Sequence, residues 1–418
     1  MAGRSGAGIA SLRQILGSPP AQEPRIGDRP RSVLTVVGGV ACTVAAVLPS
    51  FLLGGLASLV RADLRFNEAR LGLAVGCFYA ASSLSAIPGG RIAERLGPRR
   101  SMAVGIALAV GSLGGIALFA TTWGRLAAFM AVGGMSNGMI QPAAALALAR
   151  GIRQERLGIA FGVKQSAVPV ATLLAGLAVP IIGLTVGWRW AFGGAAVAAV
   201  GLLGMLPQDR TASNRERPRA RGRGAKVDRG QLPGLARVAL ASGCGAVAAN
   251  SMGAFYVESA VSSGERLALA GLLLSFGSIC GIIMRLAMGW IADRTAVDPL
   301  RMVGLMLIGG TVGYLMLGHT AGTGLLVVGT AVAFAGGWGW PGLMQLAVVQ
   351  DHMGAPAAAS GIAHAGALTG GLIGPITFGW VVSTMGYRTA WSAASVVAML
   401  AGCVLLWERR ARQEGAPS

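Results

Sequence analysis

The amino-acid sequence predicts an all-α polytopic membrane protein, with twelve transmembrane helices arranged as two six-helix halves. Of its 418 residues, 54% are hydrophobic and 12% are charged, whereas soluble domains carry about 25% charged residues. The apolar residues form long runs, and a helix needs about 20 of them to cross the hydrocarbon layer. The second half of the chain also repeats features of the first half.

Twelve apolar runs are long enough to be spans. The first six lie near residues 33–57, 70–89, 101–120, 126–148, 158–184 and 189–206. The second six lie near residues 235–259, 267–289, 301–318, 324–348, 359–384 and 388–407. We therefore expect an N-terminal bundle over residues 32–207 and a C-terminal bundle over residues 235–407.

The remaining polar segments are predicted to be cytoplasmic. A tail covers residues 1–31, a basic linker rich in Arg, Pro and Gly covers residues 208–234, and a short tail covers residues 408–418. Most of the 35 lysines and arginines fall in these segments and in alternate loops, which the positive-inside rule assigns to the cytoplasm. We expect a multi-pass protein of the plasma (inner) membrane with both termini in the cytoplasm.

The formal charge of +19 is a feature of nucleic-acid-binding proteins as well. Such proteins carry their basic residues on one accessible face, whereas here short basic clusters separate apolar runs, so no nucleic acid partner is expected. The cysteines are interpreted as small apolar packing residues, and no metal or cofactor is expected. They are Cys42, Cys77, Cys244, Cys280 and Cys403.

The repeat has a constant offset of 199 residues. The corresponding pairs are Gly54 and Gly253, Gly72 and Gly271, Gly90 and Gly289, Glu94 and Asp293, Arg95 and Arg294, Pro142 and Pro341, Gly187 and Gly386, and Arg189 and Arg388. Two halves of the same orientation imply a pseudo-twofold axis along the membrane normal, with a cavity between the halves.

Two segments between predicted spans carry a common motif. Residues 89–100 read GGRIAERLGPRR, and residues 289–294 read GWIADR. They resemble the signature loop of the major facilitator superfamily, in which Gly, three residues, Asp, Arg, one residue and Gly precede basic residues. The matching positions are Gly90, Glu94, Arg95, Gly97, Arg99 and Arg100 in the first copy and Gly289, Asp293 and Arg294 in the second. The first copy has Glu for Asp, and the second lacks the trailing Gly and basic pair.

This resemblance implies a secondary transporter that works by alternating access. A carboxylate at the membrane edge can pair with arginine in one conformation and separate from it in the other. We expect the motif residues to be gate elements and not substrate ligands, although their arginines also enforce topology.

Ionisable side chains inside spans are costly and indicate functional sites. Lys164 lies in the fifth predicted span, Arg285 in the eighth and His364 in the eleventh, so the cavity is expected to bind an anion. Residues 285–289 resemble the eighth span of the monocarboxylate and oxalate/formate branches, in which an arginine at this spacing binds the substrate carboxylate. The alternatives are that Arg285 snorkels to the interface or pairs with Asp293, and that Lys164 snorkels.

Uncharged side chains in the same region are further candidates for substrate contact. They are Asn137, Gln141, Asn250, Tyr256, Trp338 and Trp340. Amides inside a bilayer also form hydrogen bonds between helices.

The leading interpretation is a monomeric secondary active transporter, not an enzyme, for a small organic anion such as a monocarboxylate. A proton or a counter-anion is the expected co-substrate, in symport or antiport. The alternative is proton-coupled efflux of drugs or metabolites. A membrane-embedded enzyme or solute receptor is a third class. The sequence contains no HxxE or DxxD constellation for an enzyme, and the lack of a sizeable soluble domain disfavours a receptor.

Overall fold

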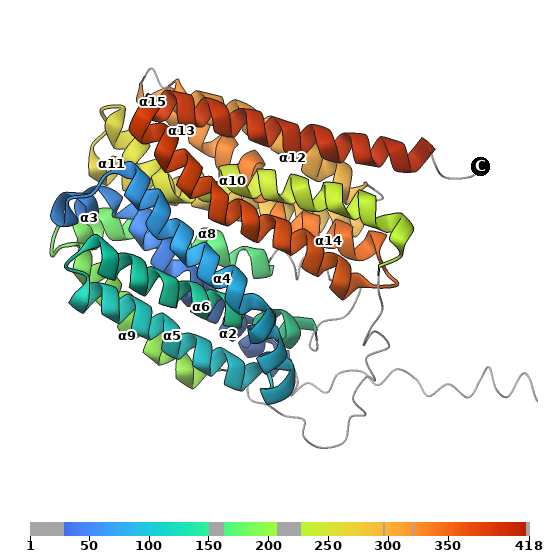
Figure 1. Cartoon of the computed structure of the whole chain (residues 1–418), viewed down its shortest axis with the longest axis horizontal. Coiled ribbons are helices and arrows are strands. Elements are labelled where there is room, and N and C mark those ends of the chain that lie inside the picture. Colours follow the sequence, from blue (N-terminus) through green and yellow to red (C-terminus); the bar gives the residue numbers. More distant parts are fainter. Residues whose placement is uncertain (1–28, 150–162, 207–226, 296, 320–321, 415–418) are drawn as a thin grey trace, which may run out of the picture.

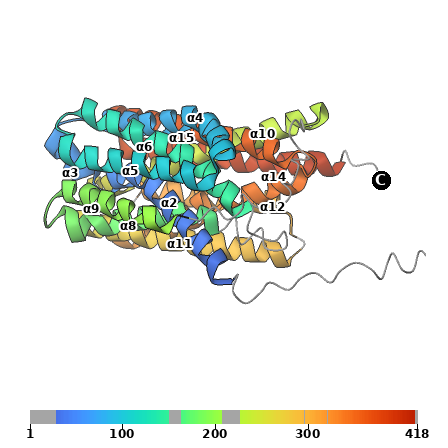
Figure 2. The same ribbon diagram turned by 90° about the horizontal axis from the view of Figure 1, so that it is seen from below.

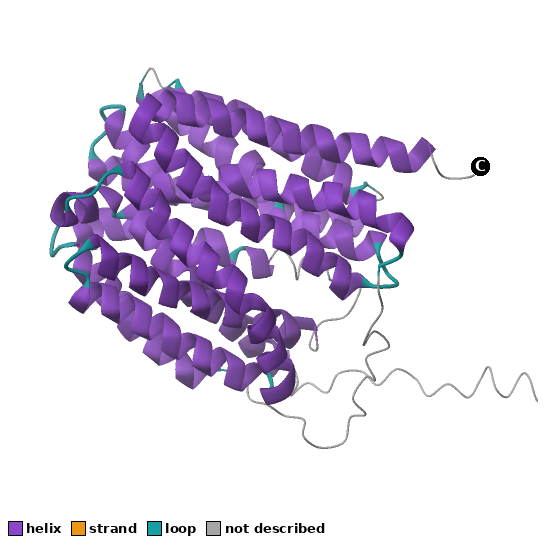
Figure 3. Cartoon of the chain, in the orientation of Figure 1, coloured by secondary structure: helices purple, strands orange, loops and turns teal. Residues whose placement is uncertain are grey.

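The computed structural model describes residues 29–149, 163–206, 227–295, 297–319 and 322–414. In this part of the chain the secondary structure is helical and contains no strand (Figure 3). Residues 1–28 of the predicted tail (1–31) and residues 208–226 of the predicted linker (208–234) lie outside the described residues.

The first half contains seven described α-helices and two short helical turns. They are α2 (Arg29–Gly55), α3 (Ala57–Leu64), α4 (Glu68–Leu96), α5 (Pro98–Phe119), α6 (Trp123–Ala149), α8 (Ala167–Ala178), the π-helical turn η3 (Val179–Gly183), α9 (Trp188–Gly201) and the 3-10 turn η4 (Leu202–Met205).

The second half begins with a 3-10 turn and ends with a long helical run. Its elements are η5 (Arg229–Gln231), α10 (Leu232–Ser262), α11 (Leu267–Arg294), α12 (Pro299–Gly318), α13 (Thr323–Val332), the π-helical turn η6 (Ala333–Gly337), α14 (Pro341–Asp351) and α15 (Pro356–Glu414).

Nine helical runs in the described part of the chain are long and apolar enough to cross a membrane. The longest of them, Ala358–Ala411, lies within α15, which covers both the eleventh and the twelfth predicted spans. Its helix is interrupted at Gly386, where the backbone is non-helical with φ 82°. The multi-pass helical fold is thus confirmed, while the exact number of twelve spans stays a prediction.

Local sequence sets several helix boundaries. The side chain of Asn67 accepts a hydrogen bond of 3.1 Å from the backbone N–H of Arg70 and caps α4. Asp298 accepts one of 2.9 Å from the N–H of Leu300 and caps α12. The turn between α4 and α5 is made at Gly97, with φ 86°, and Pro98 then occupies the first helical position, where no N–H is needed.

Several helices extend beyond their predicted bounds. The span predicted over residues 70–89 belongs to a helix that continues to Leu96, so Gly90, Glu94 and Arg95 are helical and not in a loop. Likewise α10 begins at Leu232, inside the predicted linker. Hydropathy locates the apolar part of a helix, whereas Glu and Arg are good helix formers that prolong it past the membrane edge.

The two halves lie side by side in one bundle. The first half occupies the lower part of Figure 1 and the second half the upper part. The halves meet where α2 lies against α10, α4 against α15, and α8 against α11, and Figure 2 shows α8 and α11 together on one side. We call the end of the bundle that carries α3 the α3 end, and the end at which α14 finishes the α14 end.

Glycines allow the halves to approach closely towards the α3 end. A Cβ atom on Gly54 would lie 2.2 Å from the carbonyl oxygen of Gly253, and one on Gly72 would lie 2.0 Å from that of Pro375. Only glycine permits backbones to come this near. The interface therefore depends on small residues at these crossings.

The contacts between the halves follow the offset of 199 residues. Gly72 meets Pro375, and a Cβ on Gly271 would lie 2.7 Å from the carbonyl oxygen of Gly176. In sequence, Gly271 corresponds to Gly72 and Gly176 to Pro375. The left-handed backbone positions Gly187 and Gly386, with φ 99° and 82°, correspond as well.

Replacing Gly72 by Ala is expected to force α4 and α15 apart, because the added methyl group would collide with backbone. The expected cost is about 1–3 kcal/mol, as for other overpacking substitutions, and a lowered Tm of the purified protein would reveal it. Gly111→Ala in α5 is the control, since no heavy atom lies within 4 Å of its added Cβ. Equal Tm changes in both variants would contradict the close-approach argument.

Candidate functional site

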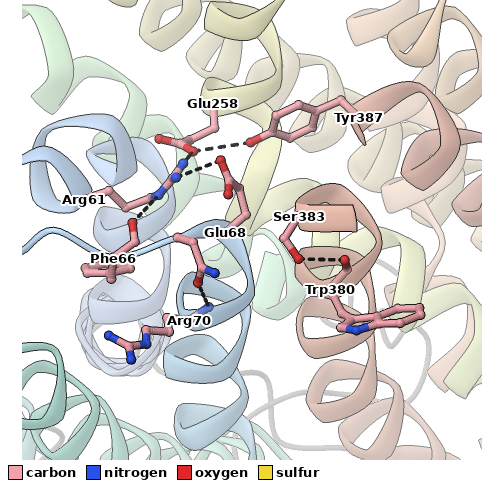
Figure 4. Close-up of polar contacts among 9 residues, drawn as sticks. Arg61, Phe66, Glu68, Arg70, Glu258, Trp380, Ser383 and Tyr387 are labelled. Carbon is pink, nitrogen blue, oxygen red and sulfur yellow. Dashed lines mark hydrogen bonds and ion pairs between the residues drawn. The ribbon is translucent and has the colours of Figure 1, made fainter. Parts of the chain in front are cut away.

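An ionic cluster joins the two halves at the α3 end (Figure 4). Arg61 of α3 bonds to Glu258 of α10 through Nη1, and its Nη2 lies 2.7 Å from Oε1 of Glu68 in α4. Its Nε donates to the carbonyl oxygen of Phe66 at 3.1 Å. The hydroxyl of Tyr387 in α15 donates to Oε2 of Glu258 at 3.3 Å. We call Arg61, Glu68, Glu258 and Tyr387 the Arg61 cluster.

Each half of the protein contributes two residues to the Arg61 cluster. Arg61 and Glu68 belong to the first half, whereas Glu258 and Tyr387 belong to the second. Glu258 is 7% exposed, and the cluster borders a cavity of about 400 Å³. Removing one partner of a buried ion pair strongly destabilises a protein, so this cluster ties the two halves together at the α3 end.

A second ion pair at the α3 end stays within the first half. Nη1 of Arg189 lies 2.5 Å from Oδ2 of Asp63, and the indole N–H of Trp188 donates to the same oxygen at 3.2 Å. The hydrogen bond from Arg189 holds the pKa of the Asp63 carboxyl below its ordinary value. This ion pair therefore does not connect the two halves.

Sequence reasoning missed the Arg61 cluster. The predicted spans leave Arg61 in the loop after the first apolar run (33–57), where α3 lies. The signal that could have found it is the pairing of opposite charges at the ends of two spans, Arg61 after the first and Glu258 in the seventh.

Aromatic and polar contacts continue the interface towards the middle of the bundle. The rings of Phe51 in α2 and Trp338 have centroids 5.6 Å apart. The hydroxyl of Tyr79 in α4 donates to Oδ1 of Asn250 in α10. These contacts also join the first half to the second.

Arg285 is a buried cation in α11 and is 3% exposed. Its Nη2 donates to the carbonyl oxygen of Trp338 at 2.5 Å, but its Nε and Nη1 have no hydrogen-bond partner. Within the described residues, no carboxylate forms an ion pair with it. The side chain thus neither reaches an exposed position nor pairs with Asp293, which were the two structural alternatives.

Lys164 and His364 belong to opposite halves. Lys164, just before α8, is buried, whereas His364 of α15 is exposed. The two side chains are near enough to interact electrostatically.

Lys164 and Arg285 lie at similar depth. Ser278 of α11 donates to Oγ1 of Thr172 in α8 at 2.8 Å, which fixes the crossing of these helices. Both cations lie on the side of this crossing that faces the α14 end. Lys164 is eight residues from Thr172 and Arg285 is seven from Ser278, which corresponds to about 10–12 Å along each helix. The fold therefore places Lys164 and Arg285 at one level, on neighbouring helices of opposite halves.

Among the remaining candidates, Asn137, Tyr256 and Trp340 form hydrogen bonds within their own halves. Asn137 donates to Oγ of Ser82 at 2.8 Å, and its Oδ1 has no partner. Tyr256 and Thr330 share a hydrogen bond of 2.5 Å, and the indole N–H of Trp340 donates to the carbonyl oxygen of Gly337 at 3.0 Å. Gln141 is half-buried one turn after Asn137.

The residues of the repeated motif lie at the α14 end. Glu94, Arg95, Arg99 and Arg100 are exposed, and Glu94 forms no ion pair within the described residues. Arg294 lies over the ring of Trp290 at 4.4 Å. Along α4, Glu94 is about 39 Å from Glu68. The predicted gate motif and the Arg61 cluster therefore occupy opposite ends of the bundle.

Comparison with known proteins assigns the family. The family model described as Major Facilitator Superfamily matches residues 39–364. The chain belongs to the major facilitator superfamily. The expected transporter family is thereby confirmed. No curated protein sequence matches this facilitator chain.

Among solved structures, the facilitator chain is similar to a bacterial homologue of the human lysosomal transporter Spinster in an inward-facing and occupied conformation. The TM-score is 0.71 and the sequence identity is 14%, over 93% of this chain and 99% of the other. At this identity the likeness concerns the fold.

We expect Glu258→Gln to open the α3 end of this facilitator, because the neutral amide loses the ion pair with Arg61. Labelling of a cysteine introduced at Ser262, in the adjoining cavity, measures the opening and should become faster. Asp63→Asn is the matched control, since it breaks an ion pair within one half. If both variants label at the parent rate, the Arg61 cluster does not hold the two halves together.

Proposed function

We propose that this facilitator is a secondary active transporter of small organic anions, and that Arg285 and Lys164 bind the negative charge of the substrate. The supporting observation is the buried guanidinium of Arg285, of which Nε and Nη1 lack hydrogen-bond partners. Monocarboxylates are the proposed substrate class.

The electrostatic argument concerns counter-ions. A buried charge is tolerated when it is paired or hydrogen-bonded. The buried acidic side chains among the described residues are Glu258 and Glu408, and each is paired with an arginine, Arg61 or Arg237. Neither is available to Arg285 or Lys164, so an anion entering between the halves would meet cations that lack counter-charges.

The stereochemical argument concerns the guanidinium. Its planar array of donors matches the two oxygens of a carboxylate, and charge-assisted hydrogen bonds of this kind are the strong ones. Lys164 adds a second positive charge from the opposite half. A substrate held between them would contact both halves, as alternating access requires.

The proposal includes orientation and coupling. With both termini in the cytoplasm, the α3 end faces outwards, so the closed Arg61 cluster corresponds to an inward-facing state. His364, an exposed imidazole beside Lys164, is the proposed acceptor for a coupled proton. The protein would act as a monomer in the inner membrane, in symport with a proton or in exchange for a second anion.

Uptake of radiolabelled lactate, pyruvate and benzoate into proteoliposomes tests this function. Arg285→Ala and Lys164→Ala are each expected to lower uptake about 30-fold or more, because truncating a buried charge pair costs about 2–5 kcal/mol. Lys164→Arg should retain part of the activity. Arg301→Ala, which removes an exposed arginine at the start of α12, is the control.

Thermal stabilisation separates anion transport from drug efflux, because a ligand that binds the folded state raises its Tm. Benzoate should raise the Tm of the parent protein and leave that of Arg285→Ala unchanged. Stabilisation by ethidium in both proteins, with none by any carboxylate, would replace the anion proposal with proton-coupled efflux.

A further inference from the structure

The helical run from α13 to α14 departs from regular α-helical geometry between residues 333 and 340, and we call this stretch the break. The π-helical turn η6 comes first, and Trp338 follows with φ −125° and ψ −1°. Pro341 then starts α14. Since proline has no N–H, the carbonyl group of Gly337 loses its helical donor. The indole N–H of Trp340 replaces that donor at 3.0 Å, so a side chain of the break itself satisfies this carbonyl.

The carbonyl group of Trp338 is satisfied from another helix. Its donor is Nη2 of Arg285 at 2.5 Å. The break thus places a main-chain acceptor beside Arg285, the cation that we propose binds the negative charge of the substrate. Buried carbonyl groups need such partners, and here the partner is a group that a ligand would also use.

The side chain of Trp338 reaches the other half of the protein. Its ring is 4% exposed and lies 5.6 Å from that of Phe51. A Cβ on Gly253 would lie 2.7 Å from the Phe51 ring and 3.0 Å from the Trp338 ring, so the aromatic pair fills its site without spare room. In a close-packed interface of this kind a displacement of one ring is transmitted to the next.

We propose that Trp338 couples anion binding at Arg285 to the contact between the two halves. The proposal rests on the proposed function of Arg285. A carboxylate is a stronger acceptor than a backbone carbonyl, and turning the planar guanidinium towards it withdraws Nη2 from Trp338. The freed carbonyl lets the break rearrange, and the Trp338 ring moves away from Phe51. Anion binding thereby favours opening of the α3 end.

Trp338 is a positioning residue in this scheme and not a substrate ligand. Its carbonyl group sets the orientation of Arg285 while the site is empty. Its ring moves relative to Phe51 when the bond to Arg285 is lost. A ligand can shift a conformational equilibrium only through a difference in affinity for the two states. The bond between Arg285 and Trp338, present in one state and absent in the other, supplies that difference.

The two cations of the site allow a matched test, because Arg285 contacts Trp338 and Lys164 forms no hydrogen bond to it. Spin labels on Ala62→Cys in α3 and Ser262→Cys in α10, both exposed positions that border the cavity at the α3 end, report its opening by pulsed electron resonance. The five native cysteines are first replaced by serine or alanine in the full chain, and no ligand is added.

Arg285→Gln is expected to raise the ratio of open to closed molecules about fivefold or more, within the usual range of coupling between sites. Lys164→Gln should leave the distance distribution unchanged. Identical distributions for parent and Arg285→Gln, or equal shifts in both variants, overturn the coupling.

A second pair of variants keeps the test valid if Arg285→Gln does not fold. Phe51→Leu removes the ring that meets Trp338 and should shift the distances in the same direction. Phe378→Leu is its control, because Phe378 pairs with Phe255 inside the second half at 5.1 Å. An unchanged distribution for Phe51→Leu overturns the proposal.

Uptake of benzoate by the same variants separates this inference from the proposed function. Loss of uptake in both cation variants, with unshifted distances in Arg285→Gln, overturns the coupling and leaves the anion site in place. Shifted distances with undiminished uptake would overturn the anion site, and Arg285 would then be a purely conformational element.

Discussion

The centre of this facilitator depends on one constraint, the buried guanidinium of Arg285. This group has more hydrogen-bond donors than the surrounding protein has acceptors for them. The protein satisfies one nitrogen of Arg285 with a main-chain carbonyl and leaves Nε and Nη1 without partners. An uncompensated charge inside a low-dielectric bundle is tolerated at sites that bind ligands. The carbonyl is available because α13 and α14 are interrupted, and the interruption depends on Pro341. The cation, the helix break and the aromatic contact of Trp338 with Phe51 therefore form one connected unit.

The interface around this unit is built from two kinds of contact that differ in how readily they separate. Glycine crossings such as Gly54 with Gly253 bring backbones together with little side-chain interdigitation, so they oppose separation mainly through dispersion. The Arg61 cluster instead adds specific polar bonds at the α3 end. Within the described residues, the ion pair that joins the halves lies at that end, while exposed His364 marks the side towards the α14 end.

Much of this fold could be predicted from the sequence because hydropathy and glycine positions report directly on membrane burial and close packing. The described helices overlap the predicted apolar runs, and Gly187 and Gly386 both have a positive φ at a turn. Arg285 and Lys164 were found because ionisable residues are rare within apolar runs. The partners were not predictable: the bond from Arg285 to the carbonyl of Trp338 depends on a break in α13–α14, and the carbonyl group carries no side-chain signature. The pairing of Arg61 with Glu258 was not predictable for a related reason. The two residues are 197 positions apart in the sequence, and only the tertiary fold brings them together.

Arg61 bonds to Glu68 in its own half and to Glu258 in the other half. Separation of the halves at the α3 end therefore affects the two halves differently. When the halves part, Arg61 keeps Glu68, since both belong to the first half, and its charge stays compensated. The unsatisfied group after separation is the carboxylate of Glu258, with Tyr387 as its remaining neighbour. The free-energy cost of opening is therefore set largely by the second half. Changes at positions 258 and 387 can therefore adjust how long the α3 end stays shut, while the α3–α4 hairpin retains the ion pair between Arg61 and Glu68.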